Sequence, residues 1–387
     1  MEQVSTLDLQ QQVARLQALL EASHKIHSTI ELDSVLRSVL QITVRELEMA
    51  GAFFTAFPFS YGSIHPRFLL NPPSSDPKRG CFRFPLLDHN GVVLTEMVVL
   101  TRDSAPLSLY EQDFLENLAM QAAVAIENAR YHERTLDLER VQRDLSCARD
   151  IQRSLLPQSM PAVPGYSIAG RSQTCFEVGG DYLDLIALPS GELLIVVADV
   201  AGKGLASALV GSSFRSGFRA IANSEMTLVE MAAHMNTLHY AEGEESRRRY
   251  VTATFLRLDT QNHTLEAVNA GHNPGFLVGT DGSVKEICAT GTPIGLVPVM
   301  SYTAETHPFQ EGSKLLFYTD GLTEVFRDED EFGSERLLNA FLSCNLGECG
   351  AILNSLWLQL DKFSNGAPQQ DDMTALALMR IRSGRET

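Results

Sequence analysis

The chain has 387 residues, of which 44% are hydrophobic and 20% are charged, so its length allows two domains and its composition excludes extensive disorder. Its 48 acidic and 31 basic residues give a net charge of −17, which disfavours nonspecific binding to nucleic acid or to anionic lipid surfaces. The sequence contains no apolar run near the roughly 20 residues that span a bilayer, and its first residues lack a signal-peptide pattern. We therefore expect a cytoplasmic protein with no nucleic-acid partner and no membrane partner.

The six cysteines are scattered along the chain and form no CxxC pair, which argues against a zinc ribbon and against a disulfide framework. Cys344 and Cys349 are expected to be small buried residues on or beside a helix. Cys81 lies in a predicted strand, where a place in the core is the better expectation than a ligand-binding role.

Two helical patterns begin the chain. An amphipathic helix is predicted within residues 1–21, because apolar residues recur there at steps of four, three and four: Leu9, Val13, Leu16 and Leu20. A similar pattern predicts a second helix over Leu32–Leu47, and Gly51 marks its stop.

Strands follow these helices. Residues 52–57 and 81–87 are predicted strands, and the segment 58–80 between them is rich in proline, glycine and serine and is predicted to be loop. The turn 88–91 contains Asn-Gly, a strong hairpin signal, and joins the second strand to a third at 92–100.

The chain is predicted to be helical again from Leu109, with a buried face formed by Leu115, Leu118, Ala122, Ala125 and Ala129. This order of elements, with the phrases ASHKIHSTIELDSVL and LSLYEQDFLENLAMQAAVAIENARYHERT, resembles a GAF domain over residues 22–130. The resemblance implies an α/β/α sensor domain that receives a small-molecule or protein signal, although many such domains are purely structural or dimerising. No charged cluster or cysteine identifies a ligand.

A heptad pattern continues from this helix through a predicted linker at 131–157. Its core positions are Val124, Glu127, Tyr131, Arg134, Leu138, Val141, Leu145, Ala148, Gln152 and Leu155. We expect a two-stranded parallel coiled coil, and hence a homodimer, in which Leu138, Val141, Leu145 and Ala148 transmit regulation. The alternative is a helix packed on its own domain. Prolines end the pattern, at Pro157, Pro161 and Pro164.

A buried β-hairpin is predicted after the linker, over 182–188 and 192–200, because both segments are rich in Leu, Ile and Val and Pro189-Ser190-Gly191 is a turn sequence. If the loop is centred on Ser190, counting outward sets Asp181 opposite Asp199 on one face of the sheet. Two opposed carboxylates favour a bound cation. The alternative is that both aspartates only cap strand ends, as Asp often does.

Further acidic residues stand at strand ends in the C-terminal part. Asp320 follows the apolar segment Lys314–Tyr318, and Asp371 and Asp372 precede the apolar segment Ala375–Met379. Converging carboxylates repel one another unless hard cations such as Mg²⁺ or Mn²⁺ lie among them. The sequence therefore favours a carboxylate metal centre.

Two other polar motifs are weaker candidates. Gly202-Lys203-Gly204 invites comparison with a phosphate-binding P-loop, but Leu205 stands where that motif needs Ser or Thr, so nucleotide hydrolysis by this route is rejected. The glycines instead allow the backbone to approach an ion or a phosphate beside the following helix. His272 could be a ligand, although a histidine in a Gly/Pro turn is more often structural.

Eight motifs in order complete the pattern: VGGDYLD, ADVAGKG, LASALVGSSFR, YVTATF, VNAGHNP, GTPIGL, YTDGLTEVF and QQDDMTAL. Together they resemble the SpoIIE/RsbU-type branch of the PPM metal-dependent serine/threonine phosphatases over residues 151–381. The resemblance implies an α+β chain whose C-terminal domain, at 158–383, is an αββα sandwich of two antiparallel sheets flanked by helices.

The resemblance also implies two Mn²⁺ or Mg²⁺ ions that activate a water for attack on phosphorus without a phosphoenzyme. Asp199 would bridge the ions, with the Val200 carbonyl contributing, and Asp181 would bind the second ion. Asp320 and Asp371 would hold the first, with Asp372 as a less certain neighbour. Asp181 and Asp199 are thus the implied catalytic residues.

The sequence departs from eukaryotic relatives at Ala201, where they carry a histidine proposed to protonate the leaving group, and it lacks their phosphate-binding arginine before Asp181. Lys203 could contact phosphate instead. The implied substrate is a phosphoserine or phosphothreonine protein, with a STAS-domain anti-sigma-factor antagonist as the expected partner. The alternatives are a catalytically silent phosphoprotein-binding regulator of the same fold and a dinuclear phosphodiesterase, although no histidine lies in the acidic motifs.

Overall fold

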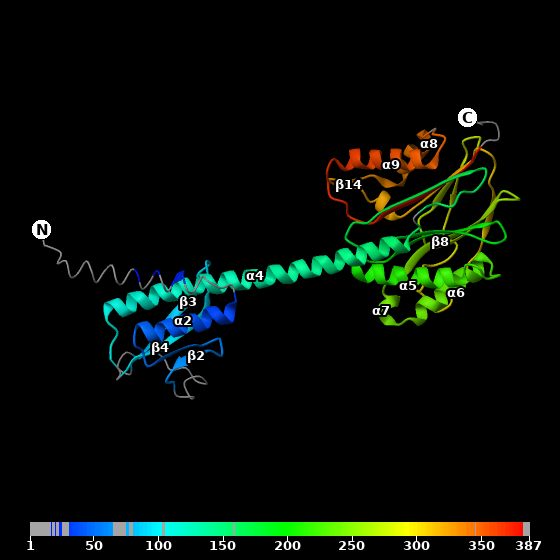
Figure 1. Ribbon diagram of the computed structural model, residues 1–387. Coiled ribbons are helices and arrows are strands. Elements are labelled where there is room, and N and C mark those ends of the chain that lie inside the picture. Colours follow the sequence, from blue (N-terminus) through cyan, green and yellow to red (C-terminus); the bar gives the residue numbers. More distant parts are fainter. Residues whose placement is uncertain are drawn as a thin grey trace. The chain divides into compact units, whose positions relative to one another are not determined.

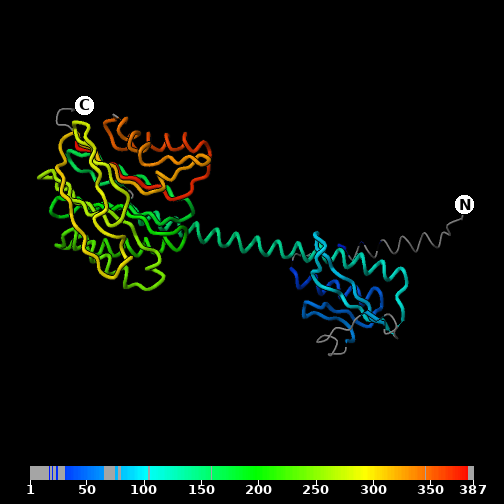
Figure 2. Tube along the Cα trace, turned by 180° about the vertical axis from the view of Figure 1, so that it is seen from behind, coloured from blue at the N-terminus to red at the C-terminus, as the bar shows by residue number. Residues whose placement is uncertain are grey.

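The computed structural model describes residues 17, 20, 23–24, 31–64, 75–76, 80–102, 105–157, 159–344 and 346–381. The chain divides into two compact units, Met1–Gln142 and Arg143–Thr387 (Figures 1 and 2). The helix predicted from Leu9, Val13 and Leu16 lies outside the described residues, and the finer domain limits stay a prediction. Among the helices that the structure describes, none combines the length and the apolar character that a membrane span requires.

The first unit is built around a four-stranded antiparallel sheet. Its strands lie in the order β2 (Ser60–Gly62), β1 (Gly51–Phe54), β4 (Val93–Leu100) and β3 (Cys81–Leu87). The hairpin predicted from Asn-Gly is confirmed by the pairing of β3 with β4. The interpretation of 58–80 as loop alone is wrong, because Ser60–Gly62 pairs with β1. Three residues are too few to produce a readable alternation of apolar and polar side chains.

Two helices cover this sheet and share one core with it. Helix α2 (Leu32–Glu46) contributes Val35 and Leu36, and the first turns of α4 (Leu109–Leu155) contribute Phe114. The predicted buried face of α4 is confirmed, since all five of its members are buried: Leu115, Leu118, Ala122, Ala125 and Ala129. Cys81 is also buried, as expected, beside Phe53 and Val98.

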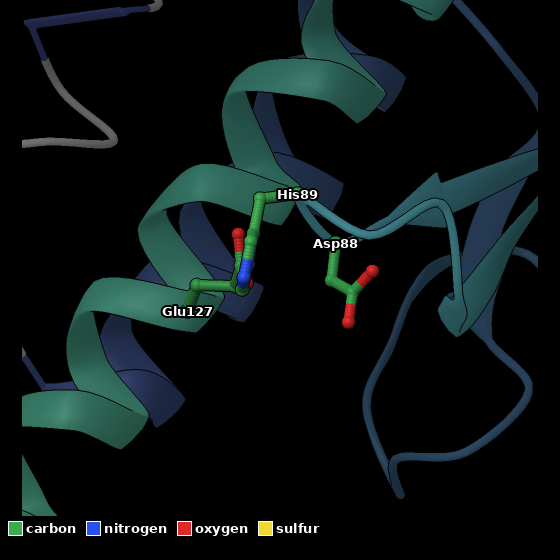
Figure 3. Close-up of side chains that lie close together, drawn as sticks. All are labelled: Asp88, His89 and Glu127. Atoms are coloured by element: carbon green, nitrogen blue, oxygen red, sulfur yellow. The ribbon is translucent and has the colours of Figure 1, made fainter.

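Three side chains of metal-ligand type lie close together, Asp88 and His89 in the β3–β4 turn and Glu127 on α4 (Figure 3). His89 Nδ1 lies 2.8 Å from the Glu127 carboxylate on α4, and this contact raises the pKa of His89. Asp88 Oδ1 accepts hydrogen bonds from the backbone amides of Asn90 and Val92. Asp88 thus stabilises the turn, and His89 pairs with Glu127, so we assign no metal ion to these three side chains.

The middle of α4 carries exposed apolar side chains. Leu138 is 65% exposed and Val141 is 55% exposed, while Leu145 and Ala148 are half-buried. These are the positions for which the heptad pattern predicts a partner helix. The coiled coil and the dimer stay predictions.

Two five-stranded antiparallel sheets form the centre of the second unit. The strands of one sheet are, in order, β12 (Glu305–Pro308), β9 (Thr264–Ala270), β8 (Val251–Asp259), β7 (Leu193–Val200) and β6 (Tyr182–Ala187). The strands of the other are β11 (Val284–Ile287), β10 (Gly275–Val278), β13 (Lys314–Tyr318), β16 (Met373–Arg380) and β5 (Tyr166–Gln173).

Helices lie on the outer face of each sheet, as Figure 1 shows for the second unit. Helices α5 (Leu205–Ile221) and α6 (Leu228–Ala241) pack on the sheet that contains β7. Helices α8 (Gly333–Ser343) and α9 (Cys349–Ser364) pack on the other sheet, where Cys344 and Cys349 are buried as expected. A third apolar core fills the space between the sheets. The predicted αββα sandwich is confirmed.

Short elements complete the second unit. They are the helix α7 (Glu244–Arg247), the 3₁₀ turn η3 (Asp320–Leu322) and the strand pair β14 (Phe326–Arg327) and β15 (Asp330–Glu331). The turn η3 directly follows the buried strand β13, so the fold carries the polar residue Asp320 at the end of an apolar strand. All six cysteines are free thiols, in line with the absence of a predicted disulfide framework.

Candidate metal centre

The β6–β7 hairpin brings two aspartates to one edge of a sheet. Its register pairs Ala187 with Leu193 and Tyr182 with Ala198, with no bulge between them. One step further outward sets Asp181 opposite Asp199, so the register counted from the turn is confirmed. Neighbouring strand β8 supports Asp199 from its other side, through pairing with Thr252.

Asp181 is almost fully buried, with 8% of its surface exposed. Its Oδ2 accepts a hydrogen bond of 2.8 Å from Thr319 Oγ1, at the end of β13, while Oδ1 has no hydrogen-bond partner. Burial first, and the negative charge of Asp199 second, raise the pKa of Asp181 well above its usual range. An unpaired buried carboxylate oxygen is costly, so this side chain is suited to a cation.

Asp199 and Asp320 experience the same two effects. Burial, followed by the charges of Asp320, Asp371 and Asp372, raises the pKa of Asp199 to about 7. Burial, followed by the charge of Asp371, also raises the pKa of Asp320. Each of these carboxylates therefore experiences the charge of its neighbours, although no three of the four proposed aspartates offer ligand atoms within 4.8 Å of one another in the described residues.

Asp371 and Asp372 are neighbours with different partners. Asp371 Oδ2 lies 2.7 Å from Lys203 Nζ, which also donates to the Gln370 carbonyl at 2.6 Å. Asp372 uses both carboxylate oxygens to accept backbone hydrogen bonds, from Cys175 and from Gly180, each at 2.7 Å. Asp372 thus holds the loop that leads to Asp181, whereas Asp371 faces the charged centre.

Two glycines bring the backbone close to this centre. A Cβ on Gly180 would lie 3.0 Å from the Val200 carbonyl oxygen, and a Cβ on Gly179 would lie 2.3 Å from Asp372 Oδ2. The segment before Asp181 therefore approaches both the end of β7 and the carboxylate of Asp372 only because it lacks side chains here.

The acidic centre lies in a region that matches a known family model. Residues 189–381 match the model described as Stage II sporulation protein E (SpoIIE). This part of the chain belongs to the SpoIIE family. Asp199, Asp320, Asp371 and Asp372 fall inside the matched segment of this SpoIIE domain, and Asp181 precedes it by eight residues.

Two curated relatives match parts of the chain. Protein IcfG from Synechocystis sp. (strain ATCC 27184 / PCC 6803 / Kazusa) is 26% identical over 262 residues, which cover 61% of this chain and 41% of that protein. Phosphoserine phosphatase RsbP from Bacillus subtilis (strain 168) is 28% identical over 188 residues, which cover 47% of this chain and 46% of that protein. The matches thus span less than half the length of both relatives.

Solved structures share the fold of the SpoIIE domain. The RsbU and RsbW domains of Rv1364c from Mycobacterium tuberculosis align with a TM-score of 0.50 and 27% identity, over 59% of this chain and 63% of that one. The SiaA-PP2C domain of Pseudomonas aeruginosa aligns with a TM-score of 0.56 and 21% identity, over 64% of this chain and 99% of that one. The second unit therefore has the PP2C-type fold.

His272 lies behind the acidic centre of the SpoIIE domain. Its Nδ1 is 2.9 Å from Thr252 Oγ1, and Thr252 is the residue paired with Asp199. Burial lowers the pKa of His272 to about 4, while the backbone of Tyr318 acts in the opposite direction. The ring Nε2 is buried without a hydrogen-bond partner. A neutral, enclosed imidazole supports the structural interpretation of this histidine.

Several contacts around the SpoIIE centre were not anticipated from the sequence. Thr319 donates to Asp181, and Gln152 from the last turns of α4 bonds to both backbone groups of Gly179, at 2.7 and 3.2 Å. Thr319 precedes Asp320 in the YTDG motif, which is a usable signal for it. Gln152 lies in the phrase ARDIQRSLLP, which resembles the entry segment of SpoIIE/RsbU-type phosphatases, but the pattern predicts only a heptad position for Gln152 itself.

The chain's own chemistry fits hard divalent cations. The acidic side chains offer only oxygen ligands, and Asp181 Oδ1 is buried without a partner. Burial first, and mutual repulsion second, raise the pKa values of three of these aspartates. Mg²⁺ and Mn²⁺ prefer carboxylate and carbonyl oxygens. The ligand set of Asp181, Asp199, Asp320 and Asp371, with the Val200 carbonyl, stays a prediction that this arrangement supports.

Proposed function

We propose that the second unit is a metal-dependent phosphatase that removes phosphate from serine and threonine side chains of a partner protein. The observation that carries the proposal is the buried, unpartnered Oδ1 of Asp181 among three further converging aspartates in a SpoIIE-family domain. When bound, two Mn²⁺ or Mg²⁺ ions would supply an activated water and would neutralise the phosphoryl oxygens.

The protein's own groups would then have distinct tasks. Asp181 and Asp199 would hold the ions from the hairpin, with the Val200 carbonyl beside them, and Asp320 and Asp371 would hold them from the opposite sheet. Asp372 is too occupied with backbone amides to be a principal ligand and would keep the loop before Asp181 in position.

Lys203 would contribute positive charge beside the phosphate, in the role that an arginine fills in eukaryotic relatives. Its ammonium group lies 2.7 Å from Asp371 Oδ2, so it belongs to the same charged centre. Ala201 offers no proton to the departing serine oxygen, so a water held at the metal centre would supply that proton. The expected consequence is a rate that depends little on any single protein acid.

The proposed substrate is the phosphorylated form of a STAS-domain anti-sigma-factor antagonist. RsbP is named a phosphoserine phosphatase, and one solved relative joins an RsbU domain to an RsbW domain in a single chain. Both names support a role in partner switching. The GAF-like unit would supply the input signal, from a small molecule or a protein, through a dimeric α4 linker.

The direct test is a Mn²⁺-dependent dephosphorylation assay on a panel of phosphorylated STAS domains from the source organism. Phosphate release should require the metal and should fall by orders of magnitude in Asp199→Asn, because this change removes a charge that both ions need while the buried strand β7 remains intact. Release that persists in Asp199→Asn at saturating Mn²⁺ would reject the dinuclear assignment. Binding of phosphorylated partners without any release would instead support the catalytically silent regulator.

A further inference from the structure

A groove of about 580 Å³ lies along α9 in the second unit. Its apolar lining includes Val325, Phe326, Trp357, Leu358 and Met373. Figure 1 shows α9 beside β14, the strand that contains Phe326. Leu358 is 61% exposed, so a large apolar side chain of the helix points toward solvent at the groove. This volume is enough for several side chains of a bound segment.

The groove lies beside the candidate metal centre. Gly321 and Gln370 line it, and they are the chain neighbours of Asp320 and Asp371. The Gln370 carbonyl also accepts the 2.6 Å hydrogen bond from Lys203. The groove and the centre therefore share the two loops that carry Asp320 and Asp371.

A series of hydrogen bonds joins the groove to the backbone of Asp371. Trp357 Nε1 donates to Gln173 Oε1 at 3.2 Å, and Gln173 Nε2 donates to Gln369 Oε1 at 2.8 Å. Gln369 Nε2 then donates to the Asp371 carbonyl at 2.6 Å. Whatever packs on Trp357 thus contacts a network that ends at a proposed metal ligand.

The charges of the groove favour a neutral or basic occupant. Arg171 is the cation among the residues that line it, and its guanidinium lies 4.6 Å from the Trp357 ring and donates to Asn354 at 3.1 Å. Glu324 and Asp361 contribute negative charge to the walls. An anionic small molecule would meet these carboxylates, whereas a lysine or arginine side chain would complement them.

We propose that this groove binds an apolar segment of the substrate protein that carries a basic residue and flanks the phosphorylated side chain. The proposal rests on the proposed phosphatase function and adds a rule for substrate choice. The position beside the centre, the apolar lining and the acidic walls all fit a polypeptide that extends beyond the phosphate itself.

Matched phosphoserine peptides test the rule. One peptide has leucine, isoleucine and lysine on both sides of the phosphoserine, the other has glycine and serine there, and p-nitrophenyl phosphate serves as a substrate with no flanking chain. With Mn²⁺ present, kcat/KM for the apolar, basic peptide should exceed that for the glycine–serine peptide by about tenfold. Equal values for the two peptides would overturn the proposal.

Leu358→Arg tests the location, with Leu358→Met as the conservative control and Val299→Arg, at an exposed apolar residue outside the groove, as a control for added charge. Leu358→Arg should abolish the preference between the peptides while p-nitrophenyl phosphate turnover stays within about twofold of the parent. Leu358→Met and Val299→Arg should retain the preference. If Leu358→Arg lowers all three activities alike, Leu358 acts through the fold and the groove is not a substrate site.

Tryptophan fluorescence measures peptide binding to the groove independently of phosphate release, so it tests the groove separately from the proposed phosphatase activity. Trp357 is the single tryptophan of the chain and lines the groove, so titration with either peptide reports occupancy without turnover. No release of phosphate from any of the three substrates would count against the proposed function. A fluorescence change specific to the apolar, basic peptide and absent in Leu358→Arg would still support the groove, and the lack of such a change would overturn it.

Discussion

Asp371 and Asp372 are adjacent in the sequence, yet their carboxylates have opposite surroundings. Asp371 faces Lys203 and the other acidic side chains, whereas Asp372 accepts two backbone amides. In Asp372→Asn, one acceptor oxygen becomes an NH₂ group that faces an N–H donor, which should cost about 1–3 kcal/mol of stability. Asp371→Asn removes a charge that repels the other aspartates, but it also removes the partly exposed ion pair with Lys203. These two effects oppose each other, so stability without metal should change less than in Asp372→Asn.

The effects on activity should be the reverse of those on stability, with the larger loss in Asp371→Asn. Asp371→Asn should nearly abolish Mn²⁺-dependent hydrolysis at any metal concentration, and Asp372→Asn should retain measurable turnover once folded. Denaturation followed through Trp357 fluorescence, together with Mn²⁺ titration of activity, measures both properties in the full chain. A stable, inactive Asp372→Asn would show that Asp372 is the principal ligand.

His272 should make the second unit sensitive to acid. Its folded pKa, about 4, lies below the unfolded value of 6.5, so the folded state binds fewer protons. Its contribution to stability is therefore complete above pH 6.5 and is lost as pH falls toward 4, by about 2 kcal/mol at pH 5.

The matched variant is His272→Gln, which cannot titrate. Urea denaturation at several pH values between 7 and 5, again followed through Trp357, should give a shallower loss of stability in the variant than in the parent. The difference between the two slopes cancels the contribution of the carboxylates. Parallel slopes would mean that His272 is solvated or already protonated in the folded protein.

At the scale of elements, an ion pair with a buried carboxylate connects helix α5 to strand β6. Arg219 donates from Nε to Asp184 Oδ2 at 2.6 Å and from Nη2 to Oδ1 at 2.9 Å, and the Tyr182 hydroxyl also donates to Asp184. Asp184 is fully buried, whereas Arg219 is partly exposed. Removal of one partner from such a pair leaves an uncompensated buried charge.

Arg219→Met should therefore destabilise the second unit by about 3 kcal/mol. Arg248→Met, at the C-cap of α7, is the control, since the pairs of Arg248 with Glu244 and Glu245 are exposed and should contribute no more than about 0.5 kcal/mol each. Because α5 begins soon after Asp199, the Mn²⁺ concentration for half-maximal activity should also rise in Arg219→Met. Thermal denaturation and Mn²⁺ titration of both variants check this, and equal melting temperatures would contradict it.

The elements that could be predicted are those whose own residues define them. The turn Pro189-Ser190-Gly191 and two apolar strands fix the register that opposes Asp181 and Asp199, so local chemistry was enough there. Strand β11, with the sequence VKEI and mostly exposed side chains, and strand β5, with YSIAGRSQ, have neither a clear alternation nor an apolar run. They become strands because they pair with β10 and β16, which is tertiary information.

Some residues of the candidate site could likewise be predicted from local sequence, and others could not. The acidic residues are recognisable because a charged side chain at the end of an apolar strand is locally unusual. The anchoring role of Asp372 depends on the backbone amides of Cys175 and Gly180, almost two hundred positions earlier, and no local pattern reports such a contact. The same is true of Lys203, which pairs with a carboxylate 168 positions away.

For the whole molecule, the path from the first unit to the centre runs through the last turns of α4. Gln152 bonds to the backbone of Gly179, two residues before Asp181, and the Leu155 carbonyl accepts a 2.8 Å hydrogen bond from Arg215 on α5. The end of the helix thus contacts both the loop that carries one proposed ligand and the helix that follows another. A change in how two copies of α4 pack could bias these contacts between two states.

These contacts, together with the exposed apolar side chains of Leu138 and Val141, predict that pairing of two α4 helices controls the phosphatase activity. Leu138→Glu with Leu145→Glu adds like charges at two core positions of the proposed coiled coil, so the protein should become monomeric and its phosphatase activity should change sharply, although neither residue is a proposed metal ligand. Leu136→Glu with Cys147→Glu adds the same charge at exposed positions outside the heptad core and should leave mass and turnover unchanged. Light scattering gives the mass, and turnover at several Mn²⁺ concentrations gives the activity. If the Leu138→Glu, Leu145→Glu variant is monomeric but matches the parent in rate and in Mn²⁺ dependence, linker control is wrong and the coiled coil only tethers the two copies. The contacts of Gln152 and Leu155 would then not depend on whether α4 is paired.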